Sequence, residues 1–268
     1  TLKLKNFKIN YLYFIYIYCN FLFVIFIFYF LFWFFLVRTF NKMSWHAAVD
    51  YRKAKTKRSF ALPARDYGEV NKIDNDVIVA ALSDDFGQTI QSHNIAKITV
   101  KSAIKTLVED HSSLSQLIDC PEVDVATSLF RKLCNSVRTA LVTGEIDNLD
   151  SLLIVSTTLV MIVASPAGTI AMRVGDGSIV YRQSGRRYES MFFQNSVNKG
   201  PISITTPDAL EHIEVASQPG IAEFICASTG GLIPYSIKES EQRPRVPFFR
   251  PLDQCAALAE TDDDIHRG

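Results

Sequence analysis

A short apolar run that ends abruptly in carboxylates is the feature that most constrains this chain. Residues Val77–Leu82 are uniformly apolar, and Asp84, Asp85 and Gly87 follow within five positions. A run of this length bounded by turn residues predicts a strand buried in the interior. Carboxylates at the end of such a strand are costly to leave unpaired, and a hard divalent cation is one way to compensate them.

Two other segments carry acidic residues in a similar position. Asp176 lies between two glycines after the segment 169–174, which is expected to form a strand, and residues Asp262, Asp263 and Asp264 lie near the C-terminus. We call the acidic residues at the ends of these segments acidic tips. Although they are far apart in sequence, we expect them to converge on one metal site.

Composition narrows the function classes. The 268 residues have a formal net charge of zero, which argues against a nonspecific binder of phosphate backbones and so against a nucleic-acid partner. The five cysteines contain no C-x-x-C pair, which excludes a zinc ribbon and a disulfide framework. Cys134 and Cys226 have apolar neighbours and predict buried thiols in a reducing, cytoplasmic compartment.

Residues 1–42 differ from the rest, and we divide the chain into this aromatic-rich segment and one domain over 43–268. From Tyr11 to Val37 no residue is charged, a length that would cross a bilayer as a helix. Lysines precede this run, and Arg38 and Lys42 follow it, so positive charge sets no orientation. The alternative, which we favour, is translated non-coding sequence, because AT-rich DNA encodes this composition. Membrane anchoring is expected only if the segment is expressed.

The remaining pattern predicts an α+β fold. Apolar residues at three- and four-residue spacing indicate helices over Ser92–Asp110 and about Val123–Val142. A strand-rich half follows, with loops and edge strands over 198–219. The segments expected to form strands are 45–49, 77–82, 152–164, 169–174, 178–183 and 221–228. This order suits helices packed on sheets rather than a doubly wound fold.

The order of short motifs resembles the metal-dependent protein phosphatases of the PP2C (PPM) family, especially their bacterial branch. The resemblance covers roughly Trp45 to Asp264 and depends on the sequential agreement of several weak matches. The matching segments are Pro63-Ala64-Arg65-Asp66, Ser83-Asp84-Asp85-Phe86-Gly87, Ser156-Thr157-Thr158-Leu159, Val174-Gly175-Asp176-Gly177, Ala227-Ser228-Thr229-Gly230-Gly231-Leu232 and Asp263-Asp264-Ile265-His266.

The resemblance implies a four-layer α-β-β-α sandwich, in which two central antiparallel sheets are flanked by helices. It further implies two Mn²⁺ or Mg²⁺ ions that activate a water for attack on phosphoserine or phosphothreonine. The expected partner is a phosphoprotein substrate, and the expected state is a monomer.

The resemblance also assigns site residues. Asp84 matches the carboxylate that bridges both metals, and Asp66 matches an early metal-associated and catalytic aspartate, although Arg65 stands where Gln or Glu is expected. Asp263 matches the last metal ligand, and Asp176 an accessory one. Each has an ordinary alternative, namely a capping or turn aspartate or a solvated acidic run.

The family has a basic residue upstream of the first aspartate, and the resemblance implies that Arg58 or Lys57 binds the substrate phosphate in this chain. An arginine at position 58 would offer bidentate contacts. The alternative is a solvated charge. His93 starts a helix beside the expected site, where a hydrogen-bonding role is the common one.

Two departures from the family pattern bear on activity. Asp85 replaces a glycine whose carbonyl is a metal ligand, so its side chain either crowds the site or adds a carboxylate. Thr229 replaces an aspartate that binds one metal directly, and a hydroxyl is a poorer ligand for a hard dication. The hypotheses are therefore an active metal-dependent phosphatase, a catalytically impaired pseudophosphatase that binds phosphoproteins, and, as a third possibility, an unrelated membrane-anchored α+β protein.

Overall fold

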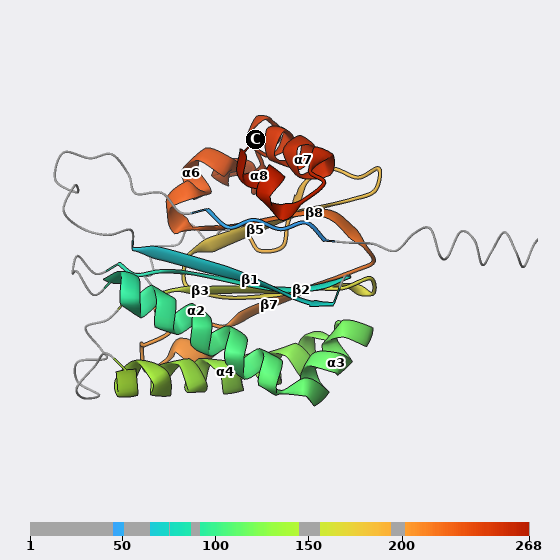
Figure 1. The fold of residues 1–268 in the computed structure, drawn as a ribbon. Helices are drawn as coiled ribbons and strands as arrows, with labels where there is room; N and C mark the ends of the chain where they lie inside the picture. Colours follow the sequence, from blue (N-terminus) through green and yellow to red (C-terminus); the bar gives the residue numbers. More distant parts are fainter. Residues whose placement is uncertain are drawn as a thin grey trace, which may run out of the picture. The chain divides into compact units, whose positions relative to one another are not determined.

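Two antiparallel sheets lie face to face, and helices cover the outer side of each (Figure 1). The computed structural model describes residues 45–50, 65–74, 76–86, 92–144, 156–193 and 202–267. Within these residues the layers follow the order helix, sheet, sheet, helix, which confirms the predicted α-β-β-α sandwich.

The larger sheet has five strands in the order β1-β2-β3-β4-β7, and every neighbouring pair is antiparallel. Its strands are β1 (Asp66–Asp74), β2 (Val77–Asp84), β3 (Leu159–Ala164), β4 (Gly168–Val174) and β7 (Glu214–Pro219). The interior strand predicted from the apolar run is β2, and the edge strand expected within 198–219 is β7. Strand β3 is buried at every position because both of its faces are covered.

The smaller sheet has the order β6-β5-β8. Its strands are β5 (Gly177–Gln183), β6 (Glu189–Ser190) and β8 (Ala222–Thr229), and a separate short ribbon pairs β9 (Ile237–Lys238) with β10 (Arg243–Pro244). On the outer face of this sheet, Val180 and Phe224 pack with Phe249 in a second, smaller apolar core.

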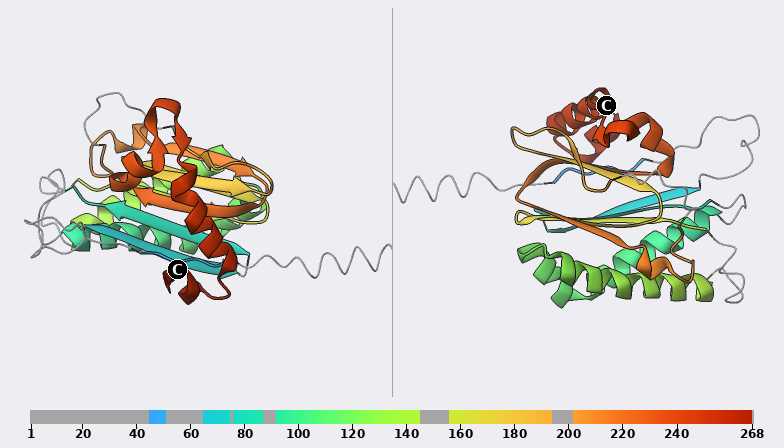
Figure 2. Two further views of the ribbon diagram at one scale, coloured as in Figure 1. Left: turned by 90° about the horizontal axis from the view of Figure 1, so that it is seen from above. Right: turned by 180° about the vertical axis from the view of Figure 1, so that it is seen from behind.

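One group of helices covers the larger sheet, and a second group lies beyond the smaller sheet (Figure 2). The first group is α2 (Ser92–Glu109), α3 (His111–Asp119) and α4 (Val123–Gly144); the second is α6 (Ile233–Ser236), α7 (Val246–Leu258) and α8 (Asp262–Arg267). Alternation along β2 sends Val79 and Ala81 into the core with these first helices, where Leu107 and Phe130 are fully buried.

The chain passes from the larger sheet to the smaller one at a two-residue turn, Gly175 and Asp176, because β4 ends at Val174 and β5 begins at Gly177. Gly175 has a φ of 85°, a backbone conformation that favours glycine. A Cβ atom on Gly177 would lie 2.4 Å from Val160 Cγ2, so the sheets approach each other too closely there for any side chain. The turn predicted around Asp176 is therefore the crossing between the two sheets.

Several elements differ from the sequence expectation, and the first is β1 (Asp66–Asp74), which was not among the predicted strands because its sequence is mostly polar. Residues 45–49 form no strand; instead the Trp45 indole donates to the Asp76 carbonyl, and the Ala47 amide donates to Asp262. Helix α3 was not predicted because its short apolar pattern lies between two longer helices. Helix α7 was not predicted because Pro247 and Pro251 interrupt its sequence, although proline is well tolerated in a first helical turn.

Residues 1–44 lie outside the described residues, as do the domain boundary and the membrane segment proposed there. In the part of the chain that the structure describes, none of the helices combines the length and the apolar character needed to cross a bilayer.

An ion-pair cluster joins α7 to the smaller sheet and gives a first stability prediction. The Arg182 guanidinium donates to both Asp253 oxygens (2.6 and 3.0 Å), and the Tyr188 hydroxyl donates to Asp253 at 2.7 Å. Because Asp253 is 8% exposed, Asp253→Ala removes the acceptor of the Tyr188 hydroxyl and of two Arg182 N–H groups, although Arg182 keeps its bond to Glu223, and we expect a loss of roughly 2–4 kcal/mol in urea unfolding. Lys105→Ala, which removes the exposed helical pair with Glu109, should change stability by less than about 1 kcal/mol. Equal effects of the two variants would contradict the prediction.

Candidate active site

The predicted acidic site begins at the end of β2, where two aspartates face each other across neighbouring strands. Asp66, the first residue of β1, is the direct cross-strand partner of Asp84, the last residue of β2. Directly opposite residues point to the same face of a sheet. Because Val79 and Ala81 point to the helices, strand alternation directs Asp84 and Asp66 to the face that looks toward the smaller sheet.

Asp84 has a strongly perturbed environment. Its side chain is 9% exposed, and burial, followed by the negative charge of Asp66, raises the pKa of Asp84 to about 6. The carboxylates of Asp85 and Asp176 act in the same direction, whereas the Arg65 guanidinium opposes them. The structure thus gathers several carboxylates from separate parts of the chain around Asp84, with a single arginine among the charges that act on it.

One carboxylate oxygen of Asp84 is left without a protein donor. Its Oδ1 atom is buried and accepts no hydrogen bond from the described residues. An uncompensated buried carboxylate oxygen is costly, so the site suits a ligand that supplies positive charge.

The main chain of Asp84 is held by Thr158 on the neighbouring strand. The Thr158 amide donates to the Asp84 carbonyl at 2.9 Å, and the Asp84 amide donates to the Thr158 hydroxyl oxygen at 3.2 Å. Pairing then continues beyond the regular strands through the Asp85–Thr157 bridge and a 2.7 Å bond from the Phe86 amide to the Ser156 carbonyl. The acidic tip is therefore an extension of the sheet rather than a free loop.

Buried hydroxyls support this tip from the helix side. The Ser83 hydroxyl donates to the Thr158 carbonyl and contacts the Thr157 hydroxyl, each at 2.7 Å. Ser203 accepts from the Thr157 amide at 2.8 Å. Asp85 pairs with Thr157 and is 1% exposed, so alternation directs it to the helix side, away from Asp84. Asp85 thus influences Asp84 by charge but lies on the other side of the strand.

The second acidic turn brings Asp176 to the cluster from the smaller sheet. Asp176 is exposed, and a Cβ on Gly230 would lie 2.9 Å from the Asp176 Cβ, so only a glycine fits beside it. Thr229 pairs directly with Gly177 and is half-buried. Since Gly177 faces Val160 of the larger sheet, Thr229 also faces the space between the sheets. Asp176 and Thr229 therefore flank the side of the site opposite Asp66 and Asp84.

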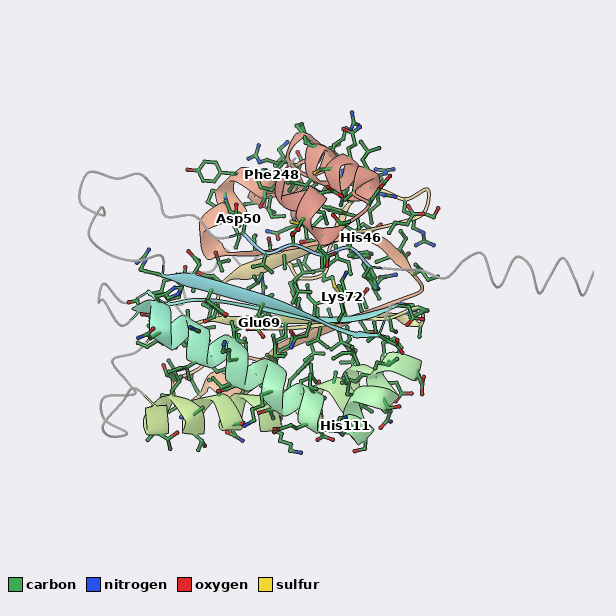
Figure 3. The ribbon with its side chains drawn as sticks, in the orientation of Figure 1. His46, Asp50, Glu69, Lys72, His111 and Phe248 are labelled. Carbon is green, nitrogen blue, oxygen red and sulfur yellow. The ribbon has the colours of Figure 1, made fainter. Side chains whose placement is uncertain are left out.

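The structure does not bring Asp263 to this cluster. Asp263 is exposed on α8, and its neighbour Asp262 binds Lys72 Nζ at 2.8 Å. Lys72 lies six residues along β1 from Asp66, a separation of roughly 20 Å at the usual rise of a strand. In Figure 3, Lys72 and His46 both lie to the right of Glu69. Contacts of Asp262 with β1 and Ala47 hold the start of α8 there, so a ligand role for Asp263 beside Asp66 and Asp84 stays a prediction that the placement of α8 does not favour.

Arg58 lies outside the described residues, so its phosphate-binding role stays a prediction. His93 packs edge-on against Tyr67, with ring centroids 5.8 Å apart, on the helix side of the larger sheet. This contact agrees with a packing role for His93 rather than a ligand role.

The donor set suits a hard cation at Asp66 and Asp84, since carboxylate oxygen is the preferred ligand of Mg²⁺ and Mn²⁺. The unpaired Asp84 oxygen fits that role. However, the described residues contain no group of three or more His, Cys, Asp or Glu side chains arranged to hold one ion. The residues present therefore suit a single cation with few protein ligands better than two cations that each have a full set of protein ligands.

A sequence profile described as protein phosphatase 2C matches residues 55–266, which is most of the chain. The chain belongs to the protein phosphatase 2C family. The match includes both acidic turns and the segment containing Thr229, so the motifs from which the resemblance was inferred lie inside it.

A related phosphatase supports the assignment to this family. Serine/threonine-protein phosphatase 3 of Escherichia coli (strain K12) is 28% identical over 103 residues, covering 38% of this chain and 41% of that protein. The match thus spans less than half of that relative.

Two solved structures share the fold. A bacterial serine phosphatase superposes with a TM-score of 0.50 at 14% identity, covering 76% of this chain and 82% of the other. Stp1, a serine/threonine phosphatase from Staphylococcus aureus, gives a TM-score of 0.50 at 12% identity, with coverages of 85% and 90%. At these identities the structures support the sandwich architecture alone.

Proposed function

We propose that this protein is a metal-dependent serine/threonine phosphatase that acts on phosphoproteins. The observation that carries the proposal is the buried Asp84 carboxylate, whose Oδ1 accepts no hydrogen bond from the described residues and which lies opposite Asp66 and within electrostatic range of Asp176. Family membership supports the reaction class, and the carboxylate donors support a divalent cation, Mn²⁺ or Mg²⁺, as cofactor.

Each part of the site has a proposed task. Asp84 and Asp66 would hold the cation, and Asp176 would contribute from the smaller sheet as an accessory group. When bound, such a cation supplies a nucleophilic water at neutral pH and neutralises phosphate charge. Arg65 is exposed and its charge reaches Asp84, so it offsets part of the repulsion that the carboxylates would exert on an incoming phosphate. No covalent phosphoenzyme is required by this arrangement.

A second candidate is a pseudophosphatase that binds phosphoproteins without turnover. Two observations favour it: Thr229 stands where the family has a metal-binding aspartate, and α8, which carries Asp263, contacts Lys72 near the other end of β1 through Asp262. A protein of this kind would keep the sandwich and the acidic turns but would bind the cation too weakly for catalysis.

Calorimetry with Mn²⁺ and turnover of p-nitrophenyl phosphate distinguish the two candidates. For the enzyme we expect a Mn²⁺ dissociation constant in the micromolar to millimolar range, and hydrolysis that EDTA removes and Mn²⁺ restores. Asp66→Asn should weaken Mn²⁺ binding by about 10-fold or more, whereas Asp119→Asn, at the exposed end of α3, should not. Absence of both Mn²⁺ binding and turnover in the unmodified protein would reject the enzyme and leave the pseudophosphatase.

A further inference from the structure

Thr158 occupies the point where the two acidic turns meet. Its hydroxyl oxygen accepts from the Asp84 amide at 3.2 Å, and its methyl group lies against Gly175, where a Cβ atom would be 2.6 Å from Thr158 Cγ2. The residue is 1% exposed. One small buried side chain thus contacts both the end of β2 and the turn that carries Asp176.

The hydrogen bond from Asp84 replaces a normal sheet bond. The pairing of Leu82 with Val160 sets Asp84 opposite Thr158, so a regular antiparallel pair would exchange two main-chain bonds. Only the bond from the Thr158 amide to the Asp84 carbonyl is of that kind. The Asp84 amide instead uses the Thr158 hydroxyl, while the Thr158 carbonyl accepts from the Ser83 hydroxyl. The main-chain position of Asp84 therefore depends on a side chain.

We propose that Thr158 is a positioning residue that sets the spacing between Asp84 and Asp176. The hydroxyl fixes the Asp84 main chain, and the methyl group seats the Gly175 turn against the larger sheet. This inference rests on the proposed function where it concerns cation binding, but its geometric part concerns the two turns alone.

Two substitutions separate the two contacts of Thr158. Thr158→Val keeps the methyl group at Gly175 and removes the acceptor of the Asp84 amide. Thr158→Ser keeps the hydroxyl and removes the methyl. Thr169→Val is the matched control, because Thr169 is equally buried, lies at the opposite end of the same sheet, and its hydroxyl has no hydrogen-bond partner among the described residues.

The measurements are Mn²⁺ affinity by calorimetry on the metal-free protein, kcat/KM with p-nitrophenyl phosphate, and the melting temperature. We expect Thr158→Val to weaken Mn²⁺ binding by about 10-fold or more and to lower kcat/KM by a similar factor. Thr158→Ser should weaken Mn²⁺ binding by a smaller factor of about 3-fold, since the Asp84 amide keeps its acceptor while the Gly175 turn loses its methyl contact. Thr169→Val should change neither quantity. Unchanged Mn²⁺ affinity in Thr158→Val, or an equal loss in Thr169→Val, would overturn the proposal.

Amide hydrogen exchange at Asp84 tests the geometry independently of catalysis. Faster exchange of this amide in Thr158→Val, but not in Thr169→Val, supports the proposal even if the unmodified protein binds no Mn²⁺ and the proposed function fails. Equal exchange rates in all three proteins would overturn it. If Thr158→Val does not fold, Thr158→Ala is measured in its place, with Thr169→Ala as control.

Discussion

Asp84→Asn is expected to abolish phosphatase activity and, at the same time, to raise the melting temperature of the metal-free protein at pH 8. The carboxylate is the central cation ligand of the proposed site, so its loss should lower kcat/KM by at least about 100-fold. The same carboxylate is buried beside other negative charges, and asparagine has nearly the same shape without the charge. Function and stability should therefore change in opposite directions.

The direction of the pH dependence follows from the raised pKa. The pKa of Asp84 is about 6 in the folded protein, against 3.8 for an unperturbed aspartate, so between these values the folded state binds more protons than the unfolded state. The ionised carboxylate thus destabilises the fold above about pH 6, by roughly 1–3 kcal/mol, and has no such effect below about pH 4. Asp84→Asn should accordingly melt at a higher temperature at pH 8 and at an equal temperature at pH 4.

Saturating Mn²⁺ should reverse the order of the two proteins. A cation that binds only the folded state at 100 times its dissociation constant adds about 2.7 kcal/mol to stability, and only the unmodified protein should gain this. Differential scanning fluorimetry at pH 4 and pH 8, with and without Mn²⁺, measures all four conditions. Asp263→Asn serves as the control, because the contact of Asp262 with Lys72 holds α8 in place. This variant should leave the melting curves with and without Mn²⁺ unchanged. A lower melting temperature for metal-free Asp84→Asn at pH 8 would contradict the burial argument.

Some regular elements of this fold could be predicted because their signals are local, whereas the polar strand β1 gives no such signal. Strand β2 is a short apolar run bounded by turn residues, and α2 and α4 have long apolar faces of helical spacing. The segment 45–49 has the same apolar character as a strand, but its partners are side chains such as Asp262, 215 positions away in sequence. No local pattern identifies such a partner, so the strand assignment failed there.

The candidate site could be predicted only in part for a similar reason. Asp66, Asp84 and Asp176 lie at strand ends and turns, where acidic residues are visible in the sequence. The side of the strand on which Asp85 lies depends on the register of β2 with the Thr157 segment, which is a property of the sheet. The role of Thr158 depends on both sheets together, because its hydroxyl and methyl group contact different turns. Asp263 matched a motif, yet the position of α8 depends on contacts that the motif does not contain.

Thr229→Asp is expected to have the second largest effect, a gain of cation binding. Thr229 pairs with Gly177 and faces the space between the sheets, beside the turn that carries Asp176. A carboxylate there would add a strong oxygen ligand on the side of the site that now offers a hydroxyl. We expect Mn²⁺ affinity to rise by about 10-fold or more, with a parallel increase in p-nitrophenyl phosphate hydrolysis.

Without metal, the same change should be unfavourable, because it adds a negative charge near Asp84 and Asp176. At pH 8 the metal-free Thr229→Asp protein should lose about 1 kcal/mol or more of stability, and Mn²⁺ should more than restore it. Thr229→Asn is the matched control: it has the same size without the charge and should leave Mn²⁺ affinity within about 3-fold. An increase in affinity with aspartate but not asparagine would mean that the loss of this one carboxylate limits the present site. Equal affinities for Thr229→Asp, Thr229→Asn and the unmodified protein would mean that the two acidic turns do not share a cation, and the pseudophosphatase would then be the better description of this chain.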